Sequence, residues 1–296
     1  NLLRVLLIWL FSGWMPSFCF SSKSFKQLFS FGSKLLLSSL LHTIYTNLYT
    51  MIIGLKFSAG ELGFYNRAFT LAQFPSTNLT NVIVRAIYPI QCRLQDDNEQ
   101  LYGMFLKYMR MACFLIFPVM IGLCALAEPL VRLLLTDKWL PAVPLLQILC
   151  IAYMWDPVMK INHNMLNVKG RSDYFLYAEI LKKAVAFLIL FLTIPFGIKV
   201  MCAGLIIYSL ADIVVITYYT RKLIGISLYI QFKELFPVIL LSFSMGAVMY
   251  GSVLLLQNVW LQLGIGMLSG GLYFLVLSRY FRFQEFIILK EILSRK

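Results

Sequence analysis

Apolar stretches of roughly membrane thickness follow one another along most of this chain. A helix needs about 20 residues to cross the hydrocarbon core of a bilayer, and soluble domains do not contain a series of such stretches. Here 60% of the 296 residues are hydrophobic and 13% are charged, about half the charged share of an ordinary soluble domain. The sequence therefore predicts an all-α polytopic membrane protein. Its predicted membrane helices are residues 33–57, 62–90, 110–135, 143–166, 174–195, 199–219, 235–256 and 259–279.

The first residues already lie within a hydrophobic segment. The chain starts at Asn1, without a methionine, and no small-residue cleavage site typical of a signal peptide follows. We expect residues 1–18 to be the end of another membrane helix, and the chain to lack an N-terminal part. A polar connector at 19–32 and a basic tail at 280–296 flank the predicted helices.

The positive charge of the chain predicts its orientation in the membrane. A net charge of +13 would suggest nucleic-acid binding if it formed patches interleaved with aromatic residues, but here the charges are spread between the apolar stretches. Loops rich in lysine and arginine stay on the cytoplasmic side. We therefore expect cytoplasmic connectors at 19–32 and 220–234, a cytoplasmic C-terminus, and outward turns at 58–61, 136–142, 196–198 and 257–259. The cytoplasmic set includes Lys23, Lys26, Arg110, Lys160, Lys182, Lys183, Arg221 and Arg279, and the outward set holds only Lys56, Arg132, Lys138 and Lys199.

Motifs of enzyme chemistry are missing from the sequence. It contains no HExxH, no phosphate loop ending in GK[ST] and no GxSxG. The six cysteines are scattered without a CxxC pair, and they read as small hydrophobic residues. The connectors are too short to hold a nucleotide-binding domain. We expect neither an enzyme nor a bound metal or cofactor.

Polar residues recur at helical spacing within three predicted helices, so that each set shares one face. The simplest packing points these faces at a common interior. Such residues also form hydrogen bonds between packed membrane helices, worth about 0.6 kcal/mol on average, and both interpretations stay open. The sets are Ser39, Thr43, Asn47 and Thr50; Asn66, Thr70, Gln73, Thr77 and Asn81; and Asp156, Lys160, Asn164 and Asn167, with Asn162 and His163 beside the third.

Arg67 is the residue that most suggests a binding site. An arginine within a membrane helix is rare and marks a functional site by default. The alternative is a structural one, in which Arg67 pairs with Glu61 and reaches toward the outer surface.

Acidic residues within the apolar stretches are candidates for ion coupling. Asp156 and Lys160 are four residues apart and could neutralise each other, whereas Asp212 has no cation near it in sequence. We interpret His163 as a satisfied polar residue near a helix end. The pair Glu179 and Lys183 is interpreted as structural. Pro75, Pro118 and Pro157 lie inside predicted helices, where the missing N–H donor permits a bend.

Several segments in a fixed order resemble one protein family. Residues 47–54 (NLYTMIIG), residues 62–68 (LGFYNRA) and Pro75 look like the seventh and eighth helices of Wzx-type O-antigen and polysaccharide flippases. Many relatives carry an aspartate where Tyr49 stands here. Residues 172–296 match mainly in helix count and spacing. Further matching segments are Tyr88-Pro89, residues 93–97 (RLQDD), Pro118, residues 127–131 (AEPLV), Lys138-Trp139 and residues 144–149 (PLLQIL).

This resemblance implies a fold and a division of the chain. The family belongs to the multidrug/oligosaccharidyl-lipid/polysaccharide (MOP) exporter superfamily, whose members have two six-helix lobes around a central cavity, often followed by two more helices. By this likeness residues 1–18 would end the sixth helix, and residues 33–219 would form the second, MATE-like lobe. Residues 235–279 would be the thirteenth and fourteenth helices.

The resemblance also implies a function. It is the translocation of an undecaprenyl-pyrophosphate-linked oligosaccharide across the bacterial inner membrane by alternating access, for O-antigen, capsule or exopolysaccharide. The implied partners are this substrate, membrane lipids, the missing N-terminal lobe, a polysaccharide polymerase and a chain-length regulator, with no nucleic acid. For such a substrate Arg67 would bind the pyrophosphate, with Lys160 as a second cation. The residues expected to bind the sugar are Asn47, Asn66, Gln73, Thr77, Asn162 and Asn164.

Two other classes of function remain open. A cation-coupled drug or small-molecule antiporter of the same superfamily would use Asp156 or Asp212 as its ion site. A membrane scaffold for polysaccharide assembly would transport nothing, and would not depend on Arg67.

Overall fold

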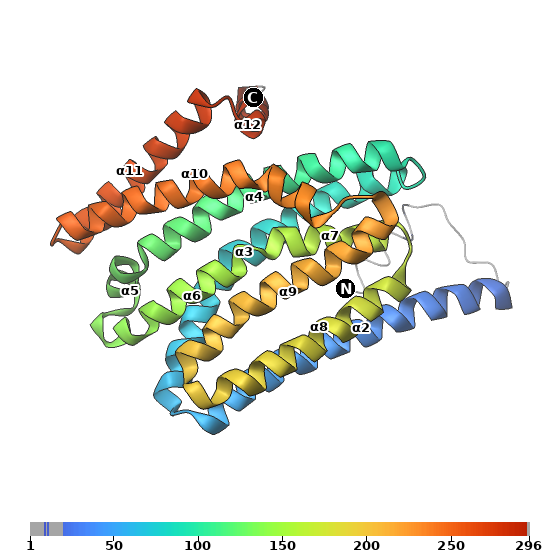
Figure 1. Ribbon diagram of the computed structural model, residues 1–296, viewed down its shortest axis with the longest axis horizontal. Coiled ribbons are helices and arrows are strands. Elements are labelled where there is room, and N and C mark those ends of the chain that lie inside the picture. Colours follow the sequence, from blue (N-terminus) through green and yellow to red (C-terminus); the bar gives the residue numbers. More distant parts are fainter. Residues whose placement is uncertain (1–8, 10, 12–19, 295–296) are drawn as a thin grey trace.

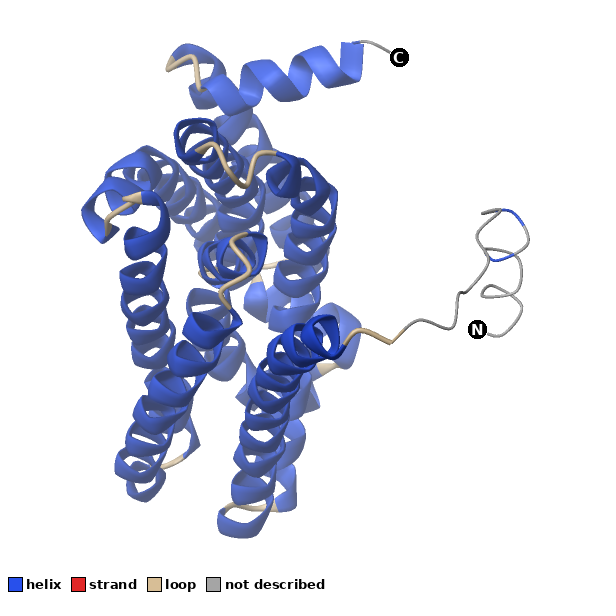
Figure 2. Ribbon diagram, turned by 90° about the vertical axis from the view of Figure 1, so that its right-hand side faces the viewer, coloured by secondary structure: helices blue, strands red, loops and turns tan. Residues whose placement is uncertain are grey.

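The computed structural model describes residue 9, residue 11 and residues 20–294. The end of a membrane helix expected at residues 1–18 lies outside the described residues, apart from residues 9 and 11. The described part contains helices and no strand (Figure 2). The α-helices with bounds in this part are α2 (Ser22–Lys56), α3 (Ala59–Arg93), α4 (Asn98–Ala125), α5 (Ala127–Leu135), α6 (Val143–Tyr153), α7 (Asp156–Val168), α8 (Ser172–Thr193), α9 (Ile198–Ile224), α10 (Leu228–Leu255), α11 (Val259–Tyr280) and α12 (Gln284–Ser294), with short 3-10 turns η1 (Asp137–Ala142) and η2 (Ile194–Phe196).

Local sequence signals account for several helix starts. The hydroxyl of Ser58 accepts a hydrogen bond from the backbone N–H of Glu61, and the Glu61 carboxylate accepts one from the backbone N–H of Ser58. This capping box satisfies two of the free N–H groups at the start of α3. The side chains of Ser21, Asp97, Ser227 and Asn258 cap α2, α4, α10 and α11 in a similar way.

Two of the predicted membrane helices are divided in the structure, and the one predicted at 33–57 already begins at Ser22, within the predicted connector 19–32. The stretch predicted as 110–135 divides into α4, which already begins at Asn98, and the short helix α5. The stretch predicted as 143–166 divides into α6 and α7 at Met154 and Trp155. Pro157 consequently lies in the first turn of α7, where its missing N–H leaves no hydrogen bond unmade. The interpretation of Pro157 as a residue inside a helix was wrong, whereas Pro75 and Pro118 do lie within α3 and α4.

Five segments of the described chain are long and apolar enough to span a membrane by length and composition. They are Asn98–Ala125, Asp137–Val168, Ile198–Ile224, Leu228–Leu255 and Val259–Tyr280. The long helices α2, α3 and α8 fall outside this selection. Two of them carry the predicted polar faces and the third carries buried charges, which lowers their apolar character.

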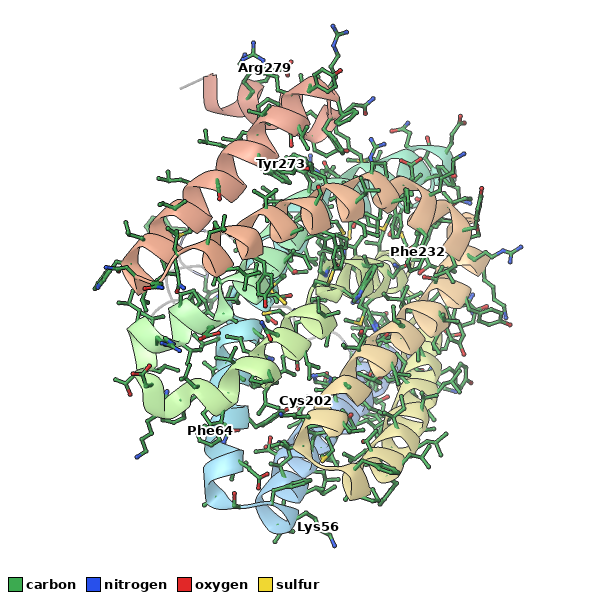
Figure 3. All side chains as sticks on the ribbon, turned by 60° about the vertical axis from the view of Figure 1, so that its left-hand side comes forward. Lys56, Phe64, Cys202, Phe232, Tyr273 and Arg279 are labelled. Carbon is green, nitrogen blue, oxygen red and sulfur yellow. The ribbon has the colours of Figure 1, made fainter. Side chains whose placement is uncertain are left out.

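The helices form a bundle in which sequence neighbours are not always spatial neighbours. Helix α8 packs between α2 and α9, and α6 packs against α3, α4 and α9, while α10 and α11 follow beyond α4 (Figure 1). Lys56 and Phe64 lie at one end of the molecule and Arg279 lies at the other (Figure 3). The turn after α2 and the end of α11 were predicted on opposite sides of the membrane, and they occupy opposite ends of the bundle.

Most of the large, fully buried side chains lie on α4, α6 and α7 or between α6 and α7. Phe117 of α4 is fully buried and meets the ring of Trp155 edge to face, with ring centroids 5.4 Å apart. A close-packed core resists deformation. Helices α3 and α7, which carry several candidate site residues, pack against α4 of this core. Other fully buried side chains of this core are Phe105, Met109, Leu146, Leu149, Met154 and Met165.

Candidate functional site

The polar face of α2 is exposed, and its side chains bond to their own helix. Thr43 Oγ1 donates to the carbonyl of Ser39 at 2.9 Å, and Asn47 Nδ2 donates to the carbonyl of Thr43 at 2.8 Å. Thr50 Oγ1 donates to the carbonyl of Thr46 at 3.3 Å. None of these bonds reaches a neighbouring helix, so this face does not bind another described helix through its polar groups.

The polar face of α3 is exposed in its first half and half-buried in its second. Asn66, Arg67 and Thr70 are exposed, whereas Gln73 and Thr77 are half-buried. These five residues share a face of one continuous helix. Their exposure therefore decreases along this face from Arg67 to Thr77.

Arg67 contacts an aromatic ring and no carboxylate in the described part of the chain. Its guanidinium lies 5.6 Å from the ring centroid of Trp139 in η1, within the range of a cation–π contact. Glu61, the partner considered from the sequence, is engaged by the hydroxyl and backbone N–H of Ser58. The guanidinium therefore keeps its hydrogen-bond donors available for an anion.

Lys160 is the second candidate cation, and it has a carboxylate partner. Its Nζ lies 3.0 Å from Asp156 Oδ2, and Thr77 Oγ1 donates to the same oxygen at 3.0 Å. Lys160 is about one third exposed, while Asp156 is nearly buried. The structure thus brings together Thr77, Asp156 and Lys160, which the sequence analysis assigned separately to sugar, ion and phosphate.

The two candidate cations lie at different levels of α3, although Lys160 itself belongs to α7. Arg67 and Thr77 are ten residues apart on this helix, which corresponds to about 15 Å of helix axis at 1.5 Å per residue. Lys160 shares a carboxylate with Thr77, and therefore lies near the Thr77 level.

Asn162 and Asn164 do not lie on the exposed face. Asn162 is fully buried and donates to Gln231 Oε1 at 2.9 Å, and Gln231 Nε2 donates back to Asn162 Oδ1 at 3.2 Å. Asn164 donates to Gln91 Oε1 at 2.7 Å. Asn164 thus faces α3, as Asp156 of the same predicted stripe does, whereas Asn162, predicted beside that stripe, joins α7 to α10. Both amides are buried and already hydrogen-bonded.

Asp212 is not an isolated carboxylate, because residues distant in sequence surround it. Its Oδ2 lies 3.2 Å from Nζ of Lys182, which also lies 2.5 Å from Glu179 Oε1 and 2.6 Å from His163 Nε2. Lys182 and Lys183 lie near the middle of α8 and are buried. Counting these two lysines among the cytoplasmic connectors and helix ends was therefore wrong. Two lysines within an apolar stretch, followed by an aspartate in the next one, were the signal for this cluster.

Two cavities lie around α10 and α11, on the side of the bundle away from α2 and α8. One has a volume of about 660 Å³ between α4, α10 and α11, and its lining is almost wholly apolar. The other has a volume of about 860 Å³, and Arg110 lies at its edge. Arg110 of α4 pairs with Glu234 of α10 at 2.8 Å and with Glu285 of α12 at 3.0 Å, and so joins the last described helix to the bundle. The first cavity is lined by Phe114, Val119, Met245, Met249, Phe274 and Lys290, among others.

Comparisons with known proteins identify relatives of this chain. Residues 1–144 match a family model described as "Polysaccharide biosynthesis protein". The chain is 27% identical to the teichuronic acid biosynthesis protein TuaB of Bacillus subtilis, over 89% of this chain and 56% of that protein. It is 28% identical to the lipopolysaccharide biosynthesis protein WzxC of Escherichia coli, over 80% of this chain and 50% of that protein. The chain spans about half the length of these relatives.

A solved structure shows the fold. The lipid II flippase MurJ, in an inward closed conformation, matches 90% of this chain and 57% of its own, with a TM-score of 0.72 and 14% sequence identity. The fold class is therefore confirmed as an all-α polytopic membrane protein with a MurJ-like arrangement of helices. The resemblance that the sequence analysis reported is confirmed as well.

Proposed function

From the confirmed resemblance to Wzx-type polysaccharide flippases of the MOP superfamily, we propose that this chain is the C-terminal part of such a flippase. The intact protein moves an undecaprenyl-pyrophosphate-linked oligosaccharide across the bacterial inner membrane for surface polysaccharide biosynthesis. Residues 33–219 act as the second lobe, and residues 235–279 as two additional helices. The C-terminal tail is cytoplasmic in this proposal.

The exposed guanidinium of Arg67 is the observation that carries the proposal. It lies on a polar helix face, beside Trp139 and without a carboxylate partner among the described residues. A guanidinium binds phosphate oxygens through two parallel hydrogen bonds. Asn47 and Asn66 supply amide groups on exposed faces for the sugar, with Gln73 deeper along α3.

The distance between the two cations supports an order of binding. In the proposed cycle the pyrophosphate contacts Lys160 and Arg67 one after the other, since about 15 Å of helix axis separates their levels. At the Lys160 level the phosphate competes with Asp156, so binding there is weaker. At Arg67 no carboxylate competes. Alternating access would come from one lobe rocking against the other around this path.

The remaining candidate residues have supporting roles in this proposal. Asn162 and Asn164 hold α7 in place, because their amides are already bonded to Gln231 and Gln91. The apolar cavity of about 660 Å³ between α4, α10 and α11 has the chemistry of a site for a lipid tail. Membrane lipids, the N-terminal lobe, a polymerase and a chain-length regulator are the proposed partners.

The test is surface-glycan display in a bacterium that lacks its own flippase and carries the cognate glycan genes. The intact protein is expected to restore display, and Arg67→Ala is expected to abolish it at matched membrane abundance. Arg67→Lys keeps the charge but not the planar fork, so partial display is expected. Arg93→Ala is the matched control, because Arg93 is an exposed arginine at the far end of the same helix.

Display by Arg67→Ala at the wild-type level would remove Arg67 from the site and favour the scaffold function. Loss of display with Arg93→Ala as well would show that α3 tolerates no loss of charge. In that case the experiment would give no support to a phosphate site at Arg67.

A further inference from the structure

A buried cluster of charged residues joins four helices at mid-height of the bundle. Glu179 and Lys182 come from α8, Asp212 comes from α9 and His163 comes from α7. Lys183 extends the cluster to α2, where its Nζ lies 3.3 Å from His42 Nδ1. Side chains of Glu179, Lys182 and Asp212 are 7%, 3% and 7% exposed, so the cluster is shielded from solvent.

Three ligand atoms converge on one ammonium group. Nζ of Lys182 lies 2.5 Å from Glu179 Oε1, 2.6 Å from His163 Nε2 and 3.2 Å from Asp212 Oδ2. Two carboxylates and an imidazole, drawn from three helices, therefore surround this cation. Here the protein's own lysine fills the centre of the set.

The cluster also holds carboxylate oxygens that no hydrogen bond uses. Glu179 Oε2 and Asp212 Oδ1 are buried and have no hydrogen-bond partner. Buried polar atoms are normally satisfied, so these two oxygens could bind a further cation or donor beside the ammonium. With Lys182 shortened, four carboxylate oxygens and one ring nitrogen would surround a vacated space.

The charges of the cluster cancel only when Lys182 is present. Glu179 and Asp212 contribute two negative charges, and Lys182 and Lys183 contribute two positive charges, with both histidines neutral. Lys183 is not an equivalent partner, because its Nζ lies 3.8 Å from Glu179 Oε2 and donates to Tyr208 Oη at 3.0 Å. An unpaired charge is strongly disfavoured at a buried position.

We propose that Glu179, Asp212 and His163 form a cation-binding site whose resident cation is the ammonium of Lys182. The site therefore takes up no free alkali ion while Lys182 is in place. Whatever drives the protein's conformational cycle, this cluster does not couple it to sodium. The inference is independent of the proposed substrate.

The test measures the thermal unfolding midpoint of the purified intact protein in sodium chloride and in choline chloride at equal ionic strength. Wild type is expected to show the same midpoint in both salts. Lys182→Ala is expected to unfold at a lower temperature in choline chloride, and to regain several degrees in a saturable response to sodium chloride. Lys183→Ala is the matched control, since it removes the same charge one residue away and leaves the three contacts of Lys182 intact. No sodium-specific response is expected from it.

Three results would overturn the inference. One is a saturable stabilisation of wild type by sodium that Asp212→Asn abolishes, because an external cation would then bind beside the lysine. Another is a Lys182→Ala protein with no sodium-specific response. The third is an equal sodium response in Lys183→Ala. If Lys182→Ala does not accumulate, Lys182→Gln replaces it with the same expected outcomes, and the wild-type measurement can overturn the inference by itself. No transport is measured, so a failure of the proposed flippase function would leave this result unaffected.

Discussion

Two polar regions of this molecule both include α2, and their polar side chains find hydrogen-bond and charge partners in different ways. The face of α2 and α3 around Asn47 and Arg67 is exposed, and the hydrogen bonds of its α2 side chains stay within their own helix. The cluster around Lys182 and Asp212 is buried, and its charges neutralise one another within α8 and between α8 and α9. A polar face that bonds only to itself is free to receive a ligand, whereas a cluster with balanced charges holds helices together.

The comparison predicts that the two regions respond differently to mutation. Substitutions in the cluster should mainly change stability. Substitutions on the exposed face should mainly change activity, because surface changes outside special features usually alter stability by about 0.5 kcal/mol or less.

The largest effect is expected from Asp212→Ala. It leaves the Lys182 ammonium with one carboxylate in a buried position, and the removal of one partner from a buried pair costs about 3 to 5 kcal/mol. We expect strongly reduced membrane abundance and a lower unfolding midpoint in detergent. Asp137→Ala is the control, since Asp137 has a 78% exposed side chain at the edge of a loose contact with Arg132. Normal abundance of Asp212→Ala would mean that the cluster is dispensable, and the contrast between the two regions would fail.

A smaller effect is expected at the buried amide pair of Asn162 and Gln231. Asn162→Leu leaves the Gln231 amide unsatisfied, and an unsatisfied buried polar group costs about 1 to 3 kcal/mol. The double variant Asn162→Leu with Gln231→Leu removes both polar groups, so it should recover part of the lost midpoint. If the double variant is less stable than either single variant, packing rather than hydrogen bonding dominates there.

The positions of the helices could be predicted from the sequence more accurately than the breaks within them. Hydropathy and spacing placed α8 (predicted 174–195) and α11 (predicted 259–279) close to their observed bounds, because each is a single apolar run. The end of α9 (predicted 219) and the start of α10 (predicted 235) were less accurate, because both helices continue into the polar connector, to Ile224 and from Leu228. The break between α6 and α7 was missed, since Met154 and Trp155 are as apolar as their neighbours. A pattern of hydrophobicity does not register a change of direction inside an apolar run.

For the candidate site, the sequence pattern likewise could not predict contacts between residues that are distant in sequence. The stripe on α2 could be predicted because its members are three or four residues apart on one helix. Lys182 could not be assigned, because Asp212 and His163 reach it from other helices. Asn162 and Asn164 follow Lys160 on the same short helix, yet they point toward Gln231 and Gln91. Only the packing of α7 determines which of its sides is exposed.

The smallest effect on stability, and the sharpest test of the contrast, is expected from Asn47→Ala. The side chain of Asn47 is exposed and bonds only to the carbonyl of Thr43 in its own helix, so its loss should leave the unfolding midpoint within about 2 °C, in keeping with a surface change of about 0.5 kcal/mol or less. If the amide contacts the sugar of the substrate, one hydrogen bond of about 0.5 to 1.5 kcal/mol is lost, and glycan display should fall by about two- to tenfold at limiting expression. Thr46→Ala is the matched control, since Thr46 is also exposed on α2 and bonds only within the helix, but lies one residue off the stripe. Equal losses of display in both variants would show that α2 is sensitive along its whole surface, and a lower midpoint for Asn47→Ala would show that the exposed face is structural after all.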